Sequence, residues 1–275
     1  RLKLLLSGDS ITHGPPMVMT SPYAWAVAKR NPSLFVENVG WGGATSMALA
    51  NPQHFKLQLP APGESGAQYV CILIGTNDAM AICAPEDWVD EAYVASDGYS
   101  AKLPKDWRTS CRPSPELYER SLVSIVRRHQ QAGARVAVAT PPPLGEDTTE
   151  HVTLKARLRR SPYQTVSELA KAVRRVAAAE GCDVLPLFEC AVHKLGKLSR
   201  PPIPWTPNDF GRRMMSCMVS RSHQASNGSR PLPFCEIGAA NNRPELCFDL
   251  VHFSEPAAAL YATLVQAWLD SAVVA

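Results

Sequence analysis

Short apolar runs alternate along this chain with longer stretches in which apolar residues recur at helical spacing. The runs have the length of buried strands and occupy residues 2–7, 34–39, 69–75, 134–140 and 182–187. The stretches with helical spacing occupy residues 22–31, 43–50, 114–132, 162–180 and 255–272. Strands that alternate with helices are typical of a parallel sheet covered by helices on both faces. The pattern therefore predicts an α/β fold.

Two segments do not fit this alternation. Residues 80–113 are rich in Trp, Pro and Cys, and a longer tract over residues 189–248 has little regular periodicity. Loops of this length are usually functional covers or partly disordered. We interpret both as insertions into a single domain of residues 1–275, a length that suits one enlarged α/β domain with 45% hydrophobic residues. The longer tract is either a cover over a substrate pocket or a disordered decoration.

The first apolar run ends abruptly in the sequence Ser7-Gly8-Asp9-Ser10-Ile11-Thr12. A strand that is cut off by Gly and Asp presents the next side chain at the carboxyl edge of a sheet, where catalytic groups lie in α/β folds. Ser10 is therefore a candidate nucleophile. An ordinary turn has the same composition and is the alternative interpretation.

A carboxylate and an imidazole stand three residues apart near the other end, at Asp249 and His252. Serine is a weak nucleophile at neutral pH and needs an imidazole to take its proton, while a carboxylate holds the imidazole in the right tautomer. The spacing suits such a base and its orienting partner. Alternatively, both residues merely flank the final helix, with Ser254 as its N-cap and Pro256 in its first turn.

Two other predicted strands end in groups that can donate hydrogen bonds to an oxyanion. The second strand leads into a loop with Gly43 at a helix start, and the third ends in Gly75-Thr76-Asn77-Asp78. Acyl transfer needs preorganised donors where negative charge develops, so the Gly43 N–H and the Asn77 amide are candidates. Each segment alone also fits a tight strand-to-helix turn. Asp9 and Asp78 are expected to brace their loops by hydrogen bonds rather than to take part in chemistry.

Taken together, these four motifs resemble the SGNH, or GDSL, hydrolase family, in which they stand in the same order. The resemblance implies a flavodoxin-like three-layer α/β/α sandwich with a five-stranded parallel sheet of order 2-1-3-4-5. It also implies that Ser10 is the nucleophile, that Asp249 and His252 complete a triad, and that the Ser10 N–H, Gly43 and Asn77 form the oxyanion hole. Ile11 replaces the usual leucine, a conservative departure that leaves the chemistry unchanged.

Softer similarity to the isoamyl-acetate-hydrolysing esterase branch of that family extends over residues 137–144, 181–188 and 249–269. The resemblance implies a serine carboxylesterase that acts on short-chain acyl or acetyl esters through an acyl-enzyme and needs no cofactor. A lysophospholipase or thioesterase and a carbohydrate acetylesterase are alternatives, because the catalytic set does not encode acyl length. A binding module that kept the fold and lost turnover is the alternative from another class.

Charge and hydropathy limit the classes of binding partner that we expect for the chain. The net charge of +3 is too small to indicate a nucleic-acid partner. No apolar stretch approaches the roughly twenty residues of a membrane span, so we expect no integral membrane segment and a small-molecule ester as the partner. The chain begins at Arg1 directly before its first strand, which leaves open whether a targeting segment has been removed. Localisation and oligomeric state stay open.

The chain contains 8 cysteines. Cys71 and Cys182 lie in predicted core strands, and the others fall in or beside the insertions, at Cys83, Cys111, Cys190, Cys217, Cys235 and Cys247. These others are either free thiols or disulfides, such as Cys83 with Cys111, and disulfides would indicate an oxidising compartment. Neither the cysteines nor the histidines have the spacing of a metal site, so we expect no metal.

Overall fold

The computed structural model describes residues 1–14, 21–52, 65–85, 113–148, 157–199, 202–214 and 245–273. These residues form a five-stranded sheet of order β2-β1-β3-β4-β5 in which neighbouring strands are parallel. The strands are β1 (Lys3–Gly8), β2 (Phe35–Asn38), β3 (Tyr69–Leu73), β4 (Arg135–Ala139) and β5 (Asp183–Leu185). The α/β fold and the strand order 2-1-3-4-5 that the sequence implied are confirmed.

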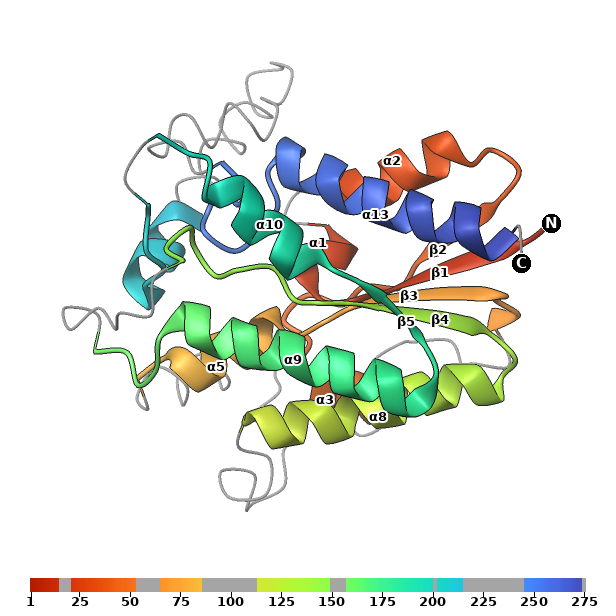
Figure 1. The fold of residues 1–275 in the computed structure, drawn as a ribbon, viewed down its shortest axis with the longest axis horizontal. Coiled ribbons are helices and arrows are strands. Elements are labelled where there is room, and N and C mark those ends of the chain that lie inside the picture. The colour runs from red at the N-terminus through yellow and green to blue at the C-terminus, as the bar shows by residue number, and fades with distance from the viewer. Residues whose placement is uncertain are drawn as a thin grey trace, which may run out of the picture.

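Helices cover both faces of the sheet (Figure 1). One face carries α1 (Ser10–His13), α2 (Pro22–Arg30), α10 (Leu187–Leu195) and α13 (Glu255–Val273). The other face carries α3 (Ser46–Ala50), α5 (Thr76–Cys83), α8 (Pro115–Gln131) and α9 (Pro162–Glu180). The molecule therefore has the three layers of an α/β/α sandwich.

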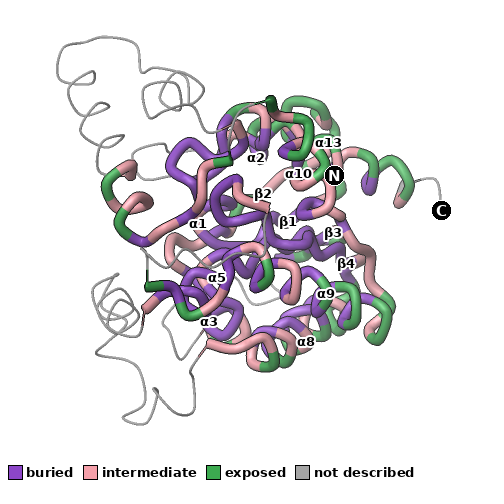
Figure 2. The backbone as a smooth tube through the Cα atoms, turned by 60° about the vertical axis from the view of Figure 1, so that its left-hand side comes forward, coloured by how far each residue is buried: buried purple, intermediate pink, exposed green. Residues whose placement is uncertain are grey.

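Each inner strand is buried on both faces, which explains its continuous apolar sequence. Successive side chains of a strand point to opposite faces, so Leu4 and Leu6 of β1 join the core under α2 and α13. Leu5 joins the core under α3, α8 and α9. Figure 2 shows the buried residues concentrated in the sheet and on the inner sides of the helices. Burial on two faces replaces the alternation of apolar and polar residues that marks a half-exposed strand.

The helix boundaries follow local signals. Ser114 caps α8 by accepting a hydrogen bond from the Leu117 N–H at 3.1 Å, and a proline follows the cap. Ser161 caps α9 in the same way, and α9 ends at Gly181 in the left-handed conformation. Both helices begin within two residues of the predicted starts.

Helices occupy the beginning of both predicted insertions. Helix α5 runs to Cys83, past the predicted start of the first insertion, and α10 occupies the beginning of the longer tract. Ala191 and Leu195 of α10 are buried in the core beside the sheet, so this part of the tract belongs to the core. Residues 207–214 are also helical. The remaining parts of both tracts, 86–112 and 215–244, lie outside the described residues, and the division into one domain with two insertions stays a prediction.

The cysteines of the described residues, including Cys83, Cys190 and Cys247, are free thiols. The disulfide between Cys83 and Cys111 that the sequence allowed is therefore not formed. Cys83 is buried, its thiol donates to the carbonyl oxygen of Ser161 at 3.8 Å, and burial raises its pKa to about 12. Cys111, Cys217 and Cys235 lie outside the described residues.

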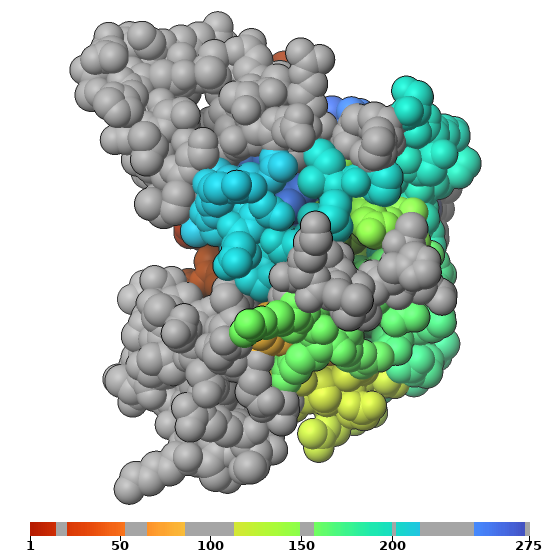
Figure 3. Space-filling model, turned by 90° about the vertical axis from the view of Figure 1, so that its left-hand side faces the viewer, coloured from red at the N-terminus to blue at the C-terminus, as the bar shows by residue number. Residues whose placement is uncertain are grey.

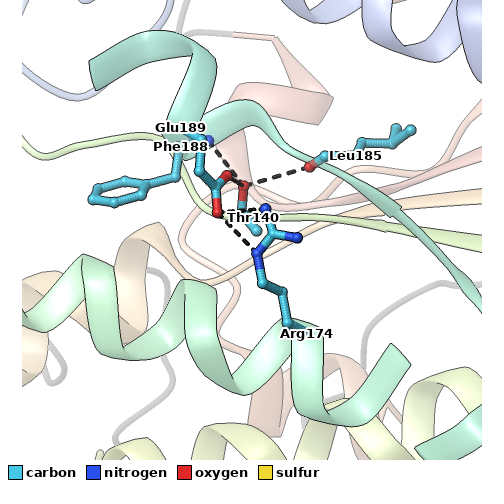
Figure 4. A network of polar contacts seen from close by, with 5 residues as sticks. All are labelled: Thr140, Arg174, Leu185, Phe188 and Glu189. Carbon is cyan, nitrogen blue, oxygen red and sulfur yellow. Dashed lines mark hydrogen bonds and ion pairs between the residues drawn. The ribbon is translucent and has the colours of Figure 1, made fainter. Parts of the chain in front are cut away.

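At the end of β4, Thr140 fixes α10 beside the carboxyl edge of the sheet (Figure 4). The buried Thr140 hydroxyl accepts a hydrogen bond from the Phe188 N–H at 2.8 Å and donates to Glu189 at 3.0 Å. Arg174 of α9 donates to the other carboxylate oxygen of Glu189 at 2.7 Å. The network joins β4, α9 and α10.

None of the described helices combines the length and the apolar composition needed to span a membrane.

Candidate active site

Ser10 stands at the carboxyl end of β1, as the first residue of the single-turn helix α1. The preceding Asp9 is fully buried and caps α1, because its carboxylate accepts a hydrogen bond from the Ile11 N–H at 2.9 Å. A side chain at Gly8 would place a Cβ 2.1 Å from the Leu73 carbonyl oxygen and 2.3 Å from the Thr12 hydroxyl. Glycine is therefore required for β1 to turn into α1 so tightly beside β3.

His252 joins Ser10 to Asp249. Its Nε2 lies 2.8 Å from the Ser10 Oγ, and its Nδ1 lies 2.7 Å from Oδ2 of Asp249. The tautomer that satisfies both contacts carries its proton on Nδ1 and leaves Nε2 to accept from the serine hydroxyl. The other oxygen of Asp249 accepts the N–H groups of Val251 and His252, at 3.0 and 2.7 Å. The structure thus brings together the three residues that the sequence indicated as a triad.

Asp249 and His252 lie on a closed loop, residues 245–254, directly before α13. Ser254 donates its hydroxyl to the carbonyl oxygens of Glu245 and Leu246, at 2.6 and 2.9 Å, and so joins the two ends of the loop. Leu250 at its tip has a φ of 77°, an uncommon conformation for a residue with a side chain. The side chain of Ser254 therefore closes a loop instead of simply leading into α13. Asp249 and His252 do not merely flank that helix.

The protonation of His252 is controlled by its surroundings. Burial lowers its pKa, but the charge of Asp249 and the hydrogen bond to it raise the pKa more, and Asp9 adds to the increase. The pKa of His252 therefore lies above its usual 6.5. Burial also raises the pKa of Asp9 to about 7, although the Ile11 hydrogen bond and His252 partly oppose this.

Asn77 lies in the first turn of α5, beside the loop that carries Gly43 before α3. The Asn77 side chain donates from Nδ2 to the carbonyl oxygen of Ala44 at 2.8 Å, which orients the amide against the Gly43 loop. Gly43 has a φ of +75°, a conformation that favours glycine. Asp78 accepts hydrogen bonds from the N–H and the hydroxyl of Ser46, at 2.9 and 2.7 Å, and so ties the start of α5 to the start of α3. Burial raises the pKa of Asp78 to about 6.

Two aromatic rings lie beside His252, and no sequence pattern had indicated them. The ring centroid of Phe248 lies 6.0 Å from that of His252 and the ring of Phe210 lies 6.2 Å from it. Phe248 directly precedes Asp249, and Phe210 comes from the helix at 207–214. Figure 3 looks onto the carboxyl edge of the sheet and shows residues 202–214 on the surface there. Part of the longer tract therefore reaches the site.

The described residues contain no group of three or more His, Cys, Asp or Glu side chains arranged to hold a metal ion. The polar groups at this edge are instead a hydroxyl, an imidazole, two amide-type donors and carboxylates. A hydroxyl that shares its proton with an imidazole can attack a carbonyl carbon. The arrangement is thus suited to acyl transfer.

Comparisons with known proteins gave a family match and solved structures of similar fold. Residues 6–214 match the model of the GDSL-like lipase/acylhydrolase family. An α/β hydrolase enzyme from the metagenome of Lake Arreo, Spain, is structurally similar, with a TM-score of 0.57, 17% identity and coverage of 97% of this chain and 94% of the other. A catalytic mutant of an acetylxylan esterase from Geobacillus stearothermophilus has a TM-score of 0.58, 16% identity and coverage of 96% and 92%. A comparison with curated proteins gave no match.

Proposed function

Because this chain belongs to the GDSL-like lipase/acylhydrolase family, we propose that it is a serine carboxylesterase that works through an acyl-enzyme. The observation that carries the proposal is the continuous hydrogen-bonded series from Ser10 through His252 to Asp249. A buried carboxylate that is bonded to Nδ1 keeps the imidazole in the tautomer that a general base needs. The geometry supports a base that is already aligned with its nucleophile.

In the proposed reaction, the Ser10 Oγ attacks the ester carbonyl carbon while its proton passes to Nε2 of His252. The tetrahedral intermediate collapses, the bond to the alcohol oxygen breaks, and His252 returns the proton to the leaving alcohol. Water then attacks the acyl-enzyme with the same proton transfers and releases the acid. Asp249 stabilises the imidazolium that forms twice in each cycle.

The oxyanion of both tetrahedral intermediates would be held by the N–H groups of Ser10 and Gly43 and by the Asn77 amide. An amide nitrogen carries two hydrogens, and the bond to Ala44 uses one of them. The second hydrogen is the donor that the proposal assigns to the substrate. Asp9 and Asp78 have a supporting role, since each fixes the loop that carries one of these donors.

We expect Asn77→Ala to lower kcat by about a hundred- to a thousandfold with little change in KM, because the lost donor acts mainly on the transition state. Steady-state kinetics on p-nitrophenyl acetate measure both constants. Asn31→Ala is a matched control, since Asn31 ends α2 and bonds to Gln266. A raised KM with an unchanged kcat would make Asn77 a substrate contact instead.

The substrate class is open to direct test. We propose short-chain acyl or acetyl esters, in line with the resemblance to isoamyl-acetate-hydrolysing esterases, which stays a prediction. Hydrolysis of p-nitrophenyl acetate, octanoate and palmitate separates the candidates, because a lipid hydrolase prefers the longer esters. Acetylated xylan oligosaccharides test carbohydrate deacetylation. If the protein hydrolysed none of these esters and a serine-directed fluorophosphonate did not label it, the result would contradict the proposal and favour a binding module.

Phe210 is positioned to limit the length of the acyl chain, because its ring packs beside His252 and comes from the longer tract. We expect Phe210→Ala to raise the ratio of kcat/KM for octanoate over acetate by about tenfold or more, since the removed ring opens apolar space at the reacting centre. The three p-nitrophenyl esters measure this ratio. Phe35→Ala, at an exposed ring on β2, is the control, and an unchanged profile in Phe210→Ala would exclude this part of the tract as a determinant of acyl length.

A further inference from the structure

Glu146 is a buried carboxylate in the connection that follows β4, and only 2% of it is exposed. Its Oε1 accepts the N–H of Glu245 and, at 3.3 Å, the N–H of Leu246. These two residues begin the 245–254 loop that carries Asp249 and His252. A buried carboxylate oxygen that accepts two backbone N–H groups forms charge-assisted hydrogen bonds, which are stronger than neutral ones.

The backbone of Gly145 and Glu146 contacts the same loop and the segment of residues 202–214. The Gly145 N–H donates to the carbonyl oxygen of Leu250, at the tip of the loop, at 2.8 Å. The Glu146 N–H donates to the carbonyl oxygen of Ile203 at 2.8 Å, in the segment that continues to Phe210. The connection after β4 therefore contacts the start and the tip of the loop, and it also holds the segment that places an aromatic ring beside His252.

Asp249 and His252 form an internally rigid unit. Oδ1 of Asp249 binds the N–H groups of Val251 and His252, and Oδ2 binds the His252 ring. Such a unit moves as one body, so its position relative to Ser10 depends on the points where the loop is anchored. Ser254 satisfies the carbonyl oxygens of Glu245 and Leu246, and Glu146 satisfies their N–H groups.

From these contacts we infer that Glu146 is a positioning residue that sets the place of His252 relative to Ser10. The inference rests on the proposed function of the triad. Glu146 acts through the backbone N–H groups at the start of the loop. Displacement of a catalytic group by about 1 Å can cost about a hundredfold in rate. The loss should fall on kcat, because the Glu146 side chain bonds to the loop that carries the base, whereas its backbone N–H, which every variant keeps, contacts the segment that carries Phe210.

Three variants test whether Glu146 acts as a hydrogen-bond acceptor or through its charge. Glu146→Gln keeps an oxygen that can accept both N–H groups but removes the charge, so it should retain most of the turnover. Glu146→Asp keeps the charge but withdraws the acceptor, and Glu146→Ala removes it. We expect both to lower kcat on p-nitrophenyl acetate by about ten- to a hundredfold, with KM within about twofold of the parent. Glu189→Ala is the matched control, a carboxylate of the same edge that binds Thr140 and Arg174 and not the loop.

A second measurement does not depend on turnover. The Nδ1 proton of His252 should give a far-downfield proton NMR resonance in the parent and in Glu146→Gln. In Glu146→Asp the resonance should broaden or shift, because a displaced unit loses the contact of Nε2 with Ser10 and the ring exchanges its proton with water faster. All kinetics are run at temperatures where thermal unfolding shows each variant to be folded. Inactivity of the parent towards every ester would count against the proposed function, whereas the NMR comparison would still test Glu146.

Several results would overturn the inference. A folded Glu146→Asp or Glu146→Ala with the parental kcat would do so, as would a loss confined to KM. A loss in Glu146→Gln beside the parental kcat in Glu146→Asp would assign the effect to charge instead of position. Unfolding of both Glu146→Asp and Glu146→Ala at every assay temperature would make the role one of stability. A resonance unchanged in Glu146→Asp would show that the base does not depend on this anchor.

Discussion

Ser10→Ala is expected to lower ester hydrolysis by about a millionfold in kcat while the protein stays folded. The proposed reaction has no other nucleophile, since His252 and the oxyanion donors are aligned with this one hydroxyl. The fold should persist because α1 is capped by the Asp9 carboxylate and not by the Ser10 side chain. Labelling with a serine-directed fluorophosphonate, together with hydrolysis of p-nitrophenyl acetate, measures the loss.

Ser7→Ala is the matched control for this variant. Ser7 is a buried serine of the same strand, three residues before the candidate nucleophile, and it should leave labelling intact. If the fluorophosphonate still modified Ser10→Ala, the nucleophile would lie elsewhere. If Ser10→Ala lost its fold, the labelling of Ser7→Ala would still show whether the edge of β1 tolerates the loss of a hydroxyl.

His252→Ala should cost about as much as Ser10→Ala, and Asp249→Ala should cost less, about ten-thousandfold. His252 transfers the proton in each step, whereas Asp249 orients the ring and stabilises its charge. Backbone carbonyls or water can partly replace an orienting group, whereas proton transfer needs a base in contact with the Ser10 hydroxyl. Steady-state kinetics of both variants measure the difference. An inactive Asp249→Ala beside an active His252→Ala would overturn the assignment.

The pH profile gives a second check on this pair. His252 acts as a base only when it is neutral, so activity rises with pH through its pKa, and the acid limb of kcat/KM reports that pKa in the free enzyme. In the parent, this limb should lie above 6.5, because Asp249 outweighs burial. In Asp249→Ala, burial still lowers the pKa of His252, but the carboxylate that raised this pKa is gone. The acid limb should therefore move to lower pH. A limb that stayed in place would mean that another group titrates.

The strands were predictable because burial on two faces leaves continuous apolar runs. The fifth run was misread at its end, however. The predicted strand continues to Leu187, whereas β5 stops at Leu185 and α10 begins at Leu187. Pro186 stands between them and cannot continue the ladder as a donor. Leu187 is apolar in either element, so periodicity alone could not distinguish a strand end from a helix start.

The triad residues could be proposed because each motif ends a strand and the motifs stand in a known order. Glu146 and Phe210 offered no such signal. The hydrogen bond from Leu246 to Glu146 joins residues 100 positions apart, and a single carboxylate after a proline-rich turn has the composition of an ordinary loop. Phe210 lies in a stretch with little periodicity. Their roles follow from tertiary contacts that no local pattern encodes.

The contact between Ser10 and His252 joins residues 242 positions apart. Synthesis proceeds from the N-terminus, so the serine leaves the ribosome long before the imidazole. Helix α13 then packs Tyr261 against Tyr23, whose hydroxyl donates to Thr12 of α1 at 2.9 Å. Under the proposed roles, a growing chain carries a serine with no base beside it. The serine therefore gains its base only when the 245–254 loop has docked beside α1.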